Sequence, residues 1–244
     1  MEILYGKNPV LEALRAGRPA RKLVLAAGVR DEPRLREILE GAAERGIPVE
    51  ETSRRRLDDI AHTEHHQGIA GYFHARTPLS LDELLARVRP PGLLLVLDGI
   101  QDPQNLGALA RSADAAGAGG MVLVRDRAAG ITPAAAKASA GAVEHLDIVV
   151  VTNLAAALTK LREAGYWCVG LDAAADMRYD RFDYTSPVAL VVGAEGEGLR
   201  PLTRKRCDAL VSLPMLGRVA SLNAAAAGAV LLYEAARQRD FRAG

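Results

Sequence analysis

Two stretches near the end of the chain place glycines and polar side chains directly after short apolar runs. The first is 187–199, with the sequence PVALVVGAEGEGL, and the second is 211–223, with the sequence VSLPMLGRVASLN. This pattern is typical of buried parallel strands that carry ligand-binding loops at their carboxyl ends. The two stretches are therefore the first candidates for a functional site.

The residue types of the first loop limit the ligand that it can hold. Gly193, Gly196 and Gly198 are spaced as G-x-x-G-x-G, whereas dinucleotide folds carry G-x-G-x-x-G, and the chain has no Gly-Lys-Ser or Gly-Lys-Thr phosphate loop. Glu195 and Glu197 place two carboxylates where backbone amides would have to bind an anion, which disfavours phosphate. A neutral or cationic ligand fits better. The alternative is a plain glycine-rich turn whose glutamates face water.

A third candidate is the stretch 98–111, with the sequence DGIQDPQNLGALAR, which carries Asn105 and Arg111 on a predicted helix. At 100° per residue, the apolar residues Leu106, Leu109, Ala110 and Ala113 form one buried face. Arg111 points away from that face among small neighbours, so a large partner can approach it. The alternatives are structural: a solvated arginine at 111, and helix caps at Asn105, Ser221 or Asn223.

The charge of the whole chain does not indicate a nucleic-acid partner, because 31 Lys and Arg residues face 30 Asp and Glu residues. Basic side chains are nevertheless clustered locally, and such patches can bind phosphates without a net positive charge. The candidates for RNA contacts are Arg15, Arg18, Arg21, Lys22, Arg54 and Arg55. The alternative is that they are solvated arginines of a chain rich in Arg and Ala.

Cysteines and histidines do not indicate disulfides or a metal site. Cys168 and Cys207 are far apart in the sequence and lie beside apolar residues, as buried thiols of cytosolic proteins do. Four of the five histidines lie between positions 62 and 74 without a Cys or carboxylate pattern, so we predict a polar loop there rather than a metal site. No secretory signal opens the chain and no apolar run reaches about 18 residues, so we expect a soluble, cytoplasmic protein.

The pattern of the chain predicts two domains. Residues 1–75 alternate predicted strands (22–27, 47–50, 68–73) with predicted helices (8–16, 32–45, 54–61), which indicates a small α/β domain. Residues 76–91 form a predicted linker with a short amphipathic helix around Leu81, Leu84 and Leu85. The Pro-Pro-Gly break at 90–92 then opens the second domain, 92–244.

The second domain is predicted to be α/β with a parallel sheet. Its strands are predicted at 93–97, 121–124, 146–151, 166–171 and 187–192, and its helices at 105–117, 133–143, 154–164 and from 223 onward. The strands are continuous apolar runs, which indicates a parallel sheet covered by helices on both faces. Ligands of such sheets bind outside the carboxyl ends of the strands, where the three candidate stretches fall.

Taken together, the three stretches resemble, in order and spacing, the three motifs of the SpoU (TrmH-like) RNA 2′-O-ribose methyltransferases of the SPOUT superfamily. The stretches 6–10 (GKNPV) and 66–69 (HQGI) are similar to the substrate-binding N-terminal domain of the RlmB branch, so the resemblance covers the whole chain. The run 224–226 (AAA) departs from the more varied run that relatives usually carry. This departure concerns helix packing and not catalysis.

The resemblance implies an L30e-like N-terminal domain and a C-terminal α/β knot, a deep trefoil knot, with S-adenosylmethionine bound bent inside the knot and no metal. The cofactor-binding residues that it implies are Gly193, Gly198, Leu213, Met215 and Leu222. The catalytic residues that it implies are Asn105, Arg111, Glu195, Ser221 and Asn223. It also implies a homodimer with shared active sites, in which Arg111 serves its own or the neighbouring subunit's site.

Methyl transfer to a ribose 2′-hydroxyl requires in-line alignment and the removal of one proton. The resemblance assigns Arg111 to the hydroxyl and its neighbouring phosphate, sometimes as the general base itself. Because a guanidinium in water keeps its proton, we expect Arg111 to bind phosphate and stabilise developing charge. The implied substrate is a guanosine of 23S rRNA. A tRNA, or another rRNA nucleotide as in antibiotic resistance, is the alternative of the same class, and a non-catalytic RNA-binding or ribosome-assembly protein is the alternative of another class.

Overall fold

The computed structural model describes residues 1–125 and 130–241, and the chain divides into two compact units. The first unit comprises residues 1–77 and 131–145, and the second comprises 78–130 and 146–244. Among the described residues, no helix has the length and apolar character needed to cross a bilayer.

The first unit is built on a four-stranded sheet in the order β1-β4-β2-β3, in which β2 and β3 run parallel and the other pairs antiparallel. The strands are β1 (Glu2–Tyr5), β2 (Ala20–Ala26), β3 (Val49–Thr52) and β4 (Ile69–Phe73). The helices are α1 (Lys7–Arg15), α2 (Pro33–Glu44), α3 (Arg54–Ala61) and α6 (Pro133–Ala138), with the short 3-10 turn η1 (Ala142–Glu144). The predicted α/β pattern is confirmed, and β1 is an additional strand.

The two N-terminal motifs, 6–10 and 66–69, meet at the start of α1. The Lys7 amide donates to Oε1 of Gln67 over 3.0 Å, and the Gly6 amide donates to the carbonyl of Ile69 over 3.1 Å. The histidines at 62–66 lie in the loop between α3 and β4, as predicted, but His66 is fully buried, where its ring bonds the Asp58 carboxylate (2.8 Å) and accepts from the Gly68 amide (2.9 Å). Within the described residues, no group of three or more His, Cys, Asp or Glu side chains could hold a metal.

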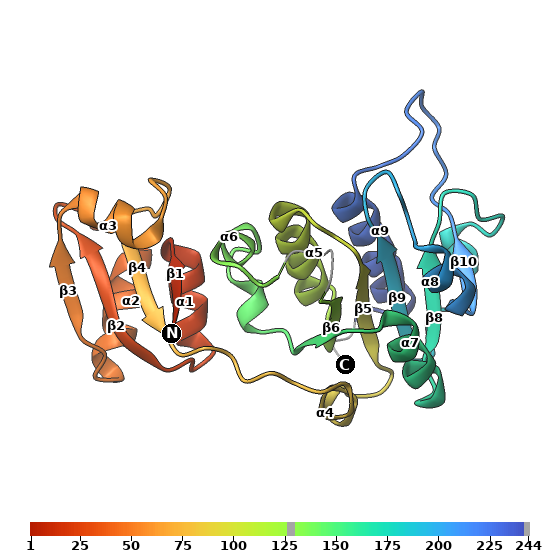
Figure 1. The fold of residues 1–244 in the computed structure, drawn as a ribbon, viewed down its shortest axis with the longest axis horizontal. Helices are drawn as coiled ribbons and strands as arrows, with labels where there is room; N and C mark the ends of the chain where they lie inside the picture. The colour runs from red at the N-terminus through yellow and green to blue at the C-terminus, as the bar shows by residue number, and fades with distance from the viewer. Residues whose placement is uncertain (126–129, 242–244) are drawn as a thin grey trace. The chain divides into compact units, whose positions relative to one another are not determined.

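The second unit contains a six-stranded, all-parallel sheet in the order β10-β8-β9-β5-β6-β7, as the apolar runs predict. The strands are β5 (Leu93–Asp98), β6 (Gly120–Val124), β7 (Ile148–Val151), β8 (Trp167–Leu171), β9 (Val188–Gly193) and β10 (Ala209–Val211). The helices are α4 (Leu81–Arg87), α5 (Pro103–Ala115), α7 (Leu154–Glu163), α8 (Pro201–Arg206) and α9 (Ala224–Gln238), with the short 3-10 turn η2 (Tyr179–Arg181). Figure 1 shows β5 and β9 at the centre of this sheet.

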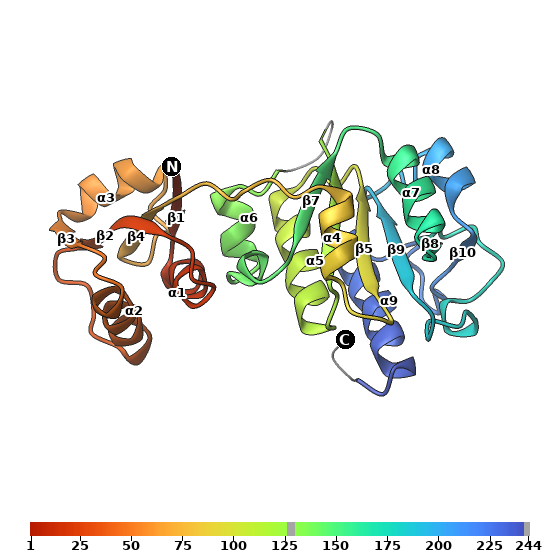
Figure 2. The same cartoon turned by 90° about the horizontal axis from the view of Figure 1, so that it is seen from below.

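Helices cover both faces of this sheet (Figure 2). On one face α5 packs against α9, so closely that a Cβ at Gly228 would lie 2.4 Å from Leu109. On the other face, α4 and α7 bury leucines such as Leu84 and Leu158 against alternate residues of the central strands. Every residue of β5 and β9 is buried, which is why both read as continuous apolar runs. The centre of the sheet therefore holds the two strand ends of the candidate site in place.

The caps of α5 and α9 differ in their relation to the site. Asp102 caps α5 by accepting from the amides of Gln104 and Asn105, so the alternative that Asn105 is the cap is wrong. Asn223 does cap α9, since its Oδ1 accepts from the amides of Ala225 (2.9 Å) and Ala226 (3.3 Å). Capping leaves the side chain of Asn105 free and uses only one end of the Asn223 amide.

Candidate functional site

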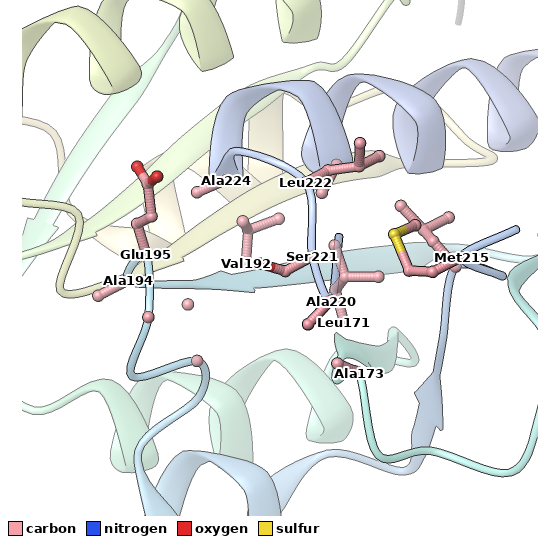
Figure 3. Close-up of a pocket in the computed structure, with 15 residues that line it drawn as sticks. Leu171, Ala173, Val192, Ala194, Glu195, Met215, Ala220, Ser221, Leu222 and Ala224 are labelled. Atoms are coloured by element: carbon pink, nitrogen blue, oxygen red, sulfur yellow. The ribbon is translucent and has the colours of Figure 1, made fainter. Parts of the chain in front are cut away.

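A pocket lies at the carboxyl ends of β8 and β9, the edge of the sheet where ligands of parallel folds bind. Its empty space, including the open solvent at its mouth, is about 740 Å³. Figure 3 shows Glu195 at one end of the pocket and Met215 at the other. The lining residues are Leu171, Ala173, Val192, Gly193, Ala194, Glu195, Gly196, Gly198, Leu213, Met215, Ala220, Ser221, Leu222, Ala224 and Ala227.

The loop after β9 turns back on itself so tightly that only glycine fits at its start. The Gly198 amide donates to the Ala194 carbonyl over 2.8 Å, and a Cβ at Gly193 would lie 2.2 Å from the Gly198 backbone. Gly198 also has a φ of 69°, in the left-handed region that favours glycine. The glycines therefore shape the floor of the pocket and keep side chains out of it.

Asp98 ties this loop to the neighbouring strand, and sequence reasoning did not single it out. It ends β5 directly beside Gly193 of β9, and its side chain is fully buried. Its Oδ2 accepts from the Arg200 amide over 2.8 Å, and its Oδ1 lies 3.4 Å from Nε of the same residue. Because the loop starts at Gly193 and ends at Arg200, both of its ends are anchored at the carboxyl edge of β5.

The second loop, 212–223, supplies the other wall of the pocket. Leu213 and Met215 line it on the way out, and Ser221 and Leu222 line it on the way back. Ser212 bonds the backbone of Met177 and Tyr179, whereas no backbone hydrogen bond joins 213–222 to other described residues. The amides and carbonyls of this stretch are thus available to a ligand, and a polar heterocycle such as adenine can pair with them.

Three predicted catalytic residues meet at the rim of the pocket. Nδ2 of Asn105 donates to Oε2 of Glu195 over 3.2 Å, and Nδ2 of Asn223 donates to the same oxygen over 3.1 Å. Nδ2 of Asn223 also donates to Oδ1 of Asn105 over 2.8 Å. The structure therefore joins the N-terminal turns of α5 and α9 to the loop after β9 through one carboxylate, which we call the Asn–Glu–Asn cluster.

The remaining predicted residues take two kinds of position. Gly193, Gly198, Leu213, Met215 and Leu222, the residues expected to bind the cofactor, all line the pocket, as does Ser221. Arg111 does not line it: it is exposed on α5 and makes no hydrogen bond or ion pair with other described residues. Arg111 is therefore available to a large partner, as its predicted role requires.

The chemistry of the lining tests which cofactor fits. Glu195 is the one titratable side chain among the fifteen lining residues, and no lysine, arginine or histidine is among them. A phosphate-rich ligand would lack a positive counter-charge here, whereas an apolar wall with one carboxylate suits a nucleoside that carries a sulfonium. The pocket thus fits S-adenosylmethionine.

One residue that was predicted to contact RNA, Arg18, is buried inside the first unit. The Arg18 side chain is only 8% exposed and pairs with Glu2 and with Glu144, a carboxylate 2% exposed. Its Nε donates to the His74 carbonyl over 2.9 Å. Because its donors are used inside the unit, Arg18 holds the fold together and offers no surface to RNA.

The other basic residues of that prediction lie at the surface in two groups. Arg15 is paired with Glu12 and Glu37, and Lys22 with Glu50. Arg21, Arg54 and Arg55 are exposed without an ion pair among the described residues. The second group is therefore the better candidate for phosphate contacts.

Two protein families match parts of this chain. The SpoU rRNA Methylase family matches residues 92–233, and a family described as RNA 2′-O ribose methyltransferase substrate binding matches residues 3–79. The two matches cover both the unit with the pocket and the N-terminal sheet. The sequence and the fold therefore define an RNA 2′-O-ribose methyltransferase.

Relatives and solved structures agree with this class. The 23S rRNA (guanosine-2′-O-)-methyltransferase RlmB of Pseudomonas putida is 43% identical over 99% of this chain and 98% of its own, and that of Ralstonia nicotianae is 44% identical over 98% and 96%. The SpoU methyltransferase AviRb of Streptomyces viridochromogenes, in complex with AdoMet, has a TM-score of 0.82 at 29% identity over 98% of this chain and 91% of its own. The chain belongs to the SpoU rRNA methylase family.

Proposed function

We propose that this enzyme methylates the 2′-hydroxyl of a guanosine in 23S rRNA. The observation that carries this proposal is the nearly full-length similarity to two RlmB enzymes, which includes the N-terminal domain as well as the catalytic one. The methyl donor is S-adenosylmethionine, which supplies an electrophilic methyl group on a sulfonium. We place the enzyme in the cytoplasm, where its substrate is made.

The cofactor is held by the two loops at the carboxyl edge of the sheet. Gly193 and Gly198 give it close access to backbone, and the unpaired backbone of Leu213 and Leu222 binds its polar edge. Met215 packs against its apolar surface. The carboxylate of Glu195 stands at the rim, where it stabilises positive charge.

Arg111 binds the RNA phosphate next to the reacting ribose. A guanidinium presents a planar set of donors that matches a phosphate in two-point contact and keeps its charge throughout. Its exposure, and the absence of a hydrogen bond or ion pair to it from residues 1–125 and 130–241, support this role. Ser221 lines the pocket and orients the ligand through its hydroxyl.

The active form is a homodimer with a knotted catalytic unit. Tyr233 and Val230 of α9 are 47% and 38% exposed, and they form an apolar face beside α5 that a second copy covers. Support for the knot comes from the segment 172–187, which bonds Ser212 in its first half and Gln238 and Arg239 in its second half. The partner brings its own α5, and with it Arg111, close to the interface.

The enzyme binds RNA mainly through contacts to the phosphate backbone and less through contacts to the bases. The chain has few aromatic side chains, 4% of all residues, which leaves little capacity for base stacking. Arg21, Arg54 and Arg55 supply exposed positive charge on the N-terminal unit, and Arg15 and Lys22 add to it when RNA phosphates replace their carboxylate partners.

Mapping of 2′-O-methylation in total RNA from cells with and without the gene tests this function directly. The expected result is the loss of one methylated guanosine in 23S rRNA, restored by the purified enzyme and S-adenosylmethionine. Loss of a 2′-O-methyl group in tRNA, or at another rRNA nucleotide, would show that the enzyme methylates a different RNA site. Cofactor binding without methyl transfer to any RNA would instead indicate a non-catalytic RNA-binding protein.

A further inference from the structure

The orientation of the Asn–Glu–Asn cluster is set by the start of α9. Oδ1 of Asn223 is occupied by the amides of Ala225 and Ala226, so the nitrogen of its amide group must point the other way. One proton of that nitrogen goes to Oδ1 of Asn105, and the other goes to Glu195. This in turn directs Nδ2 of Asn105 toward Glu195. Each amide in the cluster thus has one possible orientation.

The two carboxylate oxygens of Glu195 differ in their hydrogen bonds. Both asparagine amides donate to Oε2, and Oε1 has no hydrogen-bond partner among the described residues. Two donors on one oxygen fix the plane and direction of the carboxylate. The other oxygen therefore has no described hydrogen-bond partner, on a residue that lines the cofactor pocket and that Figure 3 shows at one end of it.

We propose that Oε1 of Glu195 is the proton acceptor of the methyl-transfer reaction. This rests on the function proposed above. The ribose 2′-oxygen takes the methyl group from sulfur, which keeps the electron pair of the broken C–S bond, and the hydroxyl proton passes to Oε1 of Glu195. After the products leave, the carboxylic acid returns this proton to water, so atoms and charges balance.

Other groups near the pocket fit this task less well. The fourteen other lining residues have no side chain that titrates, and the hydroxyl of Ser221 would itself need a base. A guanidinium keeps its proton in water, so the side chain of Arg111 is a poor proton acceptor. A carboxylate is a weak base toward a free hydroxyl. The 2′-hydroxyl becomes strongly acidic as its oxygen bonds to carbon, and a late transfer to a carboxylate is then downhill.

The substitution E195Q tests the proposal and keeps the cluster intact. The glutamine oxygen can accept from both asparagines, but the amide that replaces Oε1 cannot take a proton. E197Q is the matched control, because Glu197 lies two residues further along the same loop, is exposed and does not line the pocket.

The first readout is binding and needs no RNA. In sinefungin, a carbon that bears a primary ammonium group replaces the methylated sulfur, so this cation lies where the methyl group would be. We expect calorimetry to show that the wild type and E197Q prefer sinefungin to S-adenosylhomocysteine by about tenfold or more, because a carboxylate faces the ammonium. E195Q should lose this preference and keep its affinity for S-adenosylhomocysteine. An unchanged preference in E195Q would overturn the proposal.

The second readout is single-turnover methylation of RNA. General-base catalysis contributes about 100-fold or more, so E195Q should lose at least that factor and E197Q should not. Formate should restore turnover to E195A in proportion to its concentration, because it replaces the missing carboxylate. Near-normal turnover in E195Q, or no effect of formate on E195A, would overturn the proposal. A wild type that binds neither compound and methylates no RNA would instead contradict the proposed function itself.

Discussion

Two arginines of the catalytic unit are used in opposite ways. At the amino end of the parallel sheet, Arg239 follows α9 and donates to four backbone carbonyls, those of Pro91, Gly92, Tyr184 and Ser186, at 2.7–3.3 Å. Arg111, in the second half of α5, is exposed and bonds no described residue. The two residues are the same type, and the helices α5 and α9 pack against one another.

The comparison shows that the role of an arginine depends on its burial and its hydrogen-bond partners and not on its residue type. Four of the five N–H donors of this guanidinium meet carbonyls, which leaves little for a ligand, and burial lowers the pKa of Arg239. Its hydrogen bonds hold three segments together: 91–92, 184–186 and the end of α9. The carboxyl end instead keeps unpaired donors and acceptors beside the pocket. Stability is thus concentrated at one end and chemistry at the other.

Arg111→Lys should produce the largest effect on turnover. An ammonium cannot hold a phosphate in two-point contact, so we expect a fall in turnover of about 1,000-fold or more, at unchanged affinity for S-adenosylmethionine. Single-turnover kinetics and calorimetry on one preparation measure both quantities. Near-normal turnover of this variant would show that Arg111 has no role in the reaction.

Arg239→Met should act on stability alone. Four carbonyls lose their donor in a half-buried place, so we expect the free energy of unfolding to fall by about 2–4 kcal/mol. Urea denaturation followed by circular dichroism measures this, with Arg181→Met as the control, because Arg181 is exposed. If the folded fraction of Arg239→Met also lost its turnover, the separation between the two ends of the sheet would be wrong.

Asn223 combines both roles in one side chain, and two substitutions separate them. Asn223→Ser keeps an acceptor for the helix cap but removes the amide donors to Glu195, so we expect nearly normal stability and turnover reduced about 10- to 100-fold. Asn223→Ala should lose the same turnover and also about 1 kcal/mol of stability. Equal stability of the two variants would show that the cap contributes nothing.

The thiols should give the smallest effect. Burial raises the pKa of both Cys168 and Cys207 to about 12. Since only about one thiol in 10,000 is then ionised at pH 8, the native enzyme should react with Ellman's reagent only as fast as it unfolds. As pH rises through about 9, the unfolded chain releases thiol protons that the folded chain retains, so stability should decline there. Rapid labelling of both thiols in the native state would show that they are not buried.

Much of the fold follows from local patterns in the sequence. Apolar runs at 93–97 and 187–192 predict buried parallel strands because a strand covered on both faces has no polar side. The apolar face of α5 is confirmed, since Leu106, Leu109 and Ala113 are fully buried. The short strand β1 and the helix α8 were not predicted, because four and six residues carry too little periodicity to be distinguished from a loop.

The site was only partly visible in the sequence for a different reason. Residue types and the family resemblance indicate Asn105, Glu195 and Asn223, but the hydrogen bonds among them join residues 28 to 118 positions apart. Asp98 ends an apolar run and looks like the start of a turn, and only the neighbouring β9 loop shows that it binds Arg200. The signal that could have found it is a carboxylate at the last position of a central strand, where water is excluded.

The cap at the start of α9 has a consequence for the order in which the enzyme assembles. The amides of Ala225 and Ala226 are available as cap donors only after that helix has formed, and they set the orientation of Asn223, and through it of Glu195. During synthesis, a ribosome-bound chain that has not yet released α9 can complete β5, β6 and β9 but cannot direct that carboxylate. The enzyme therefore gains the ability to modify RNA only at the end of its own folding.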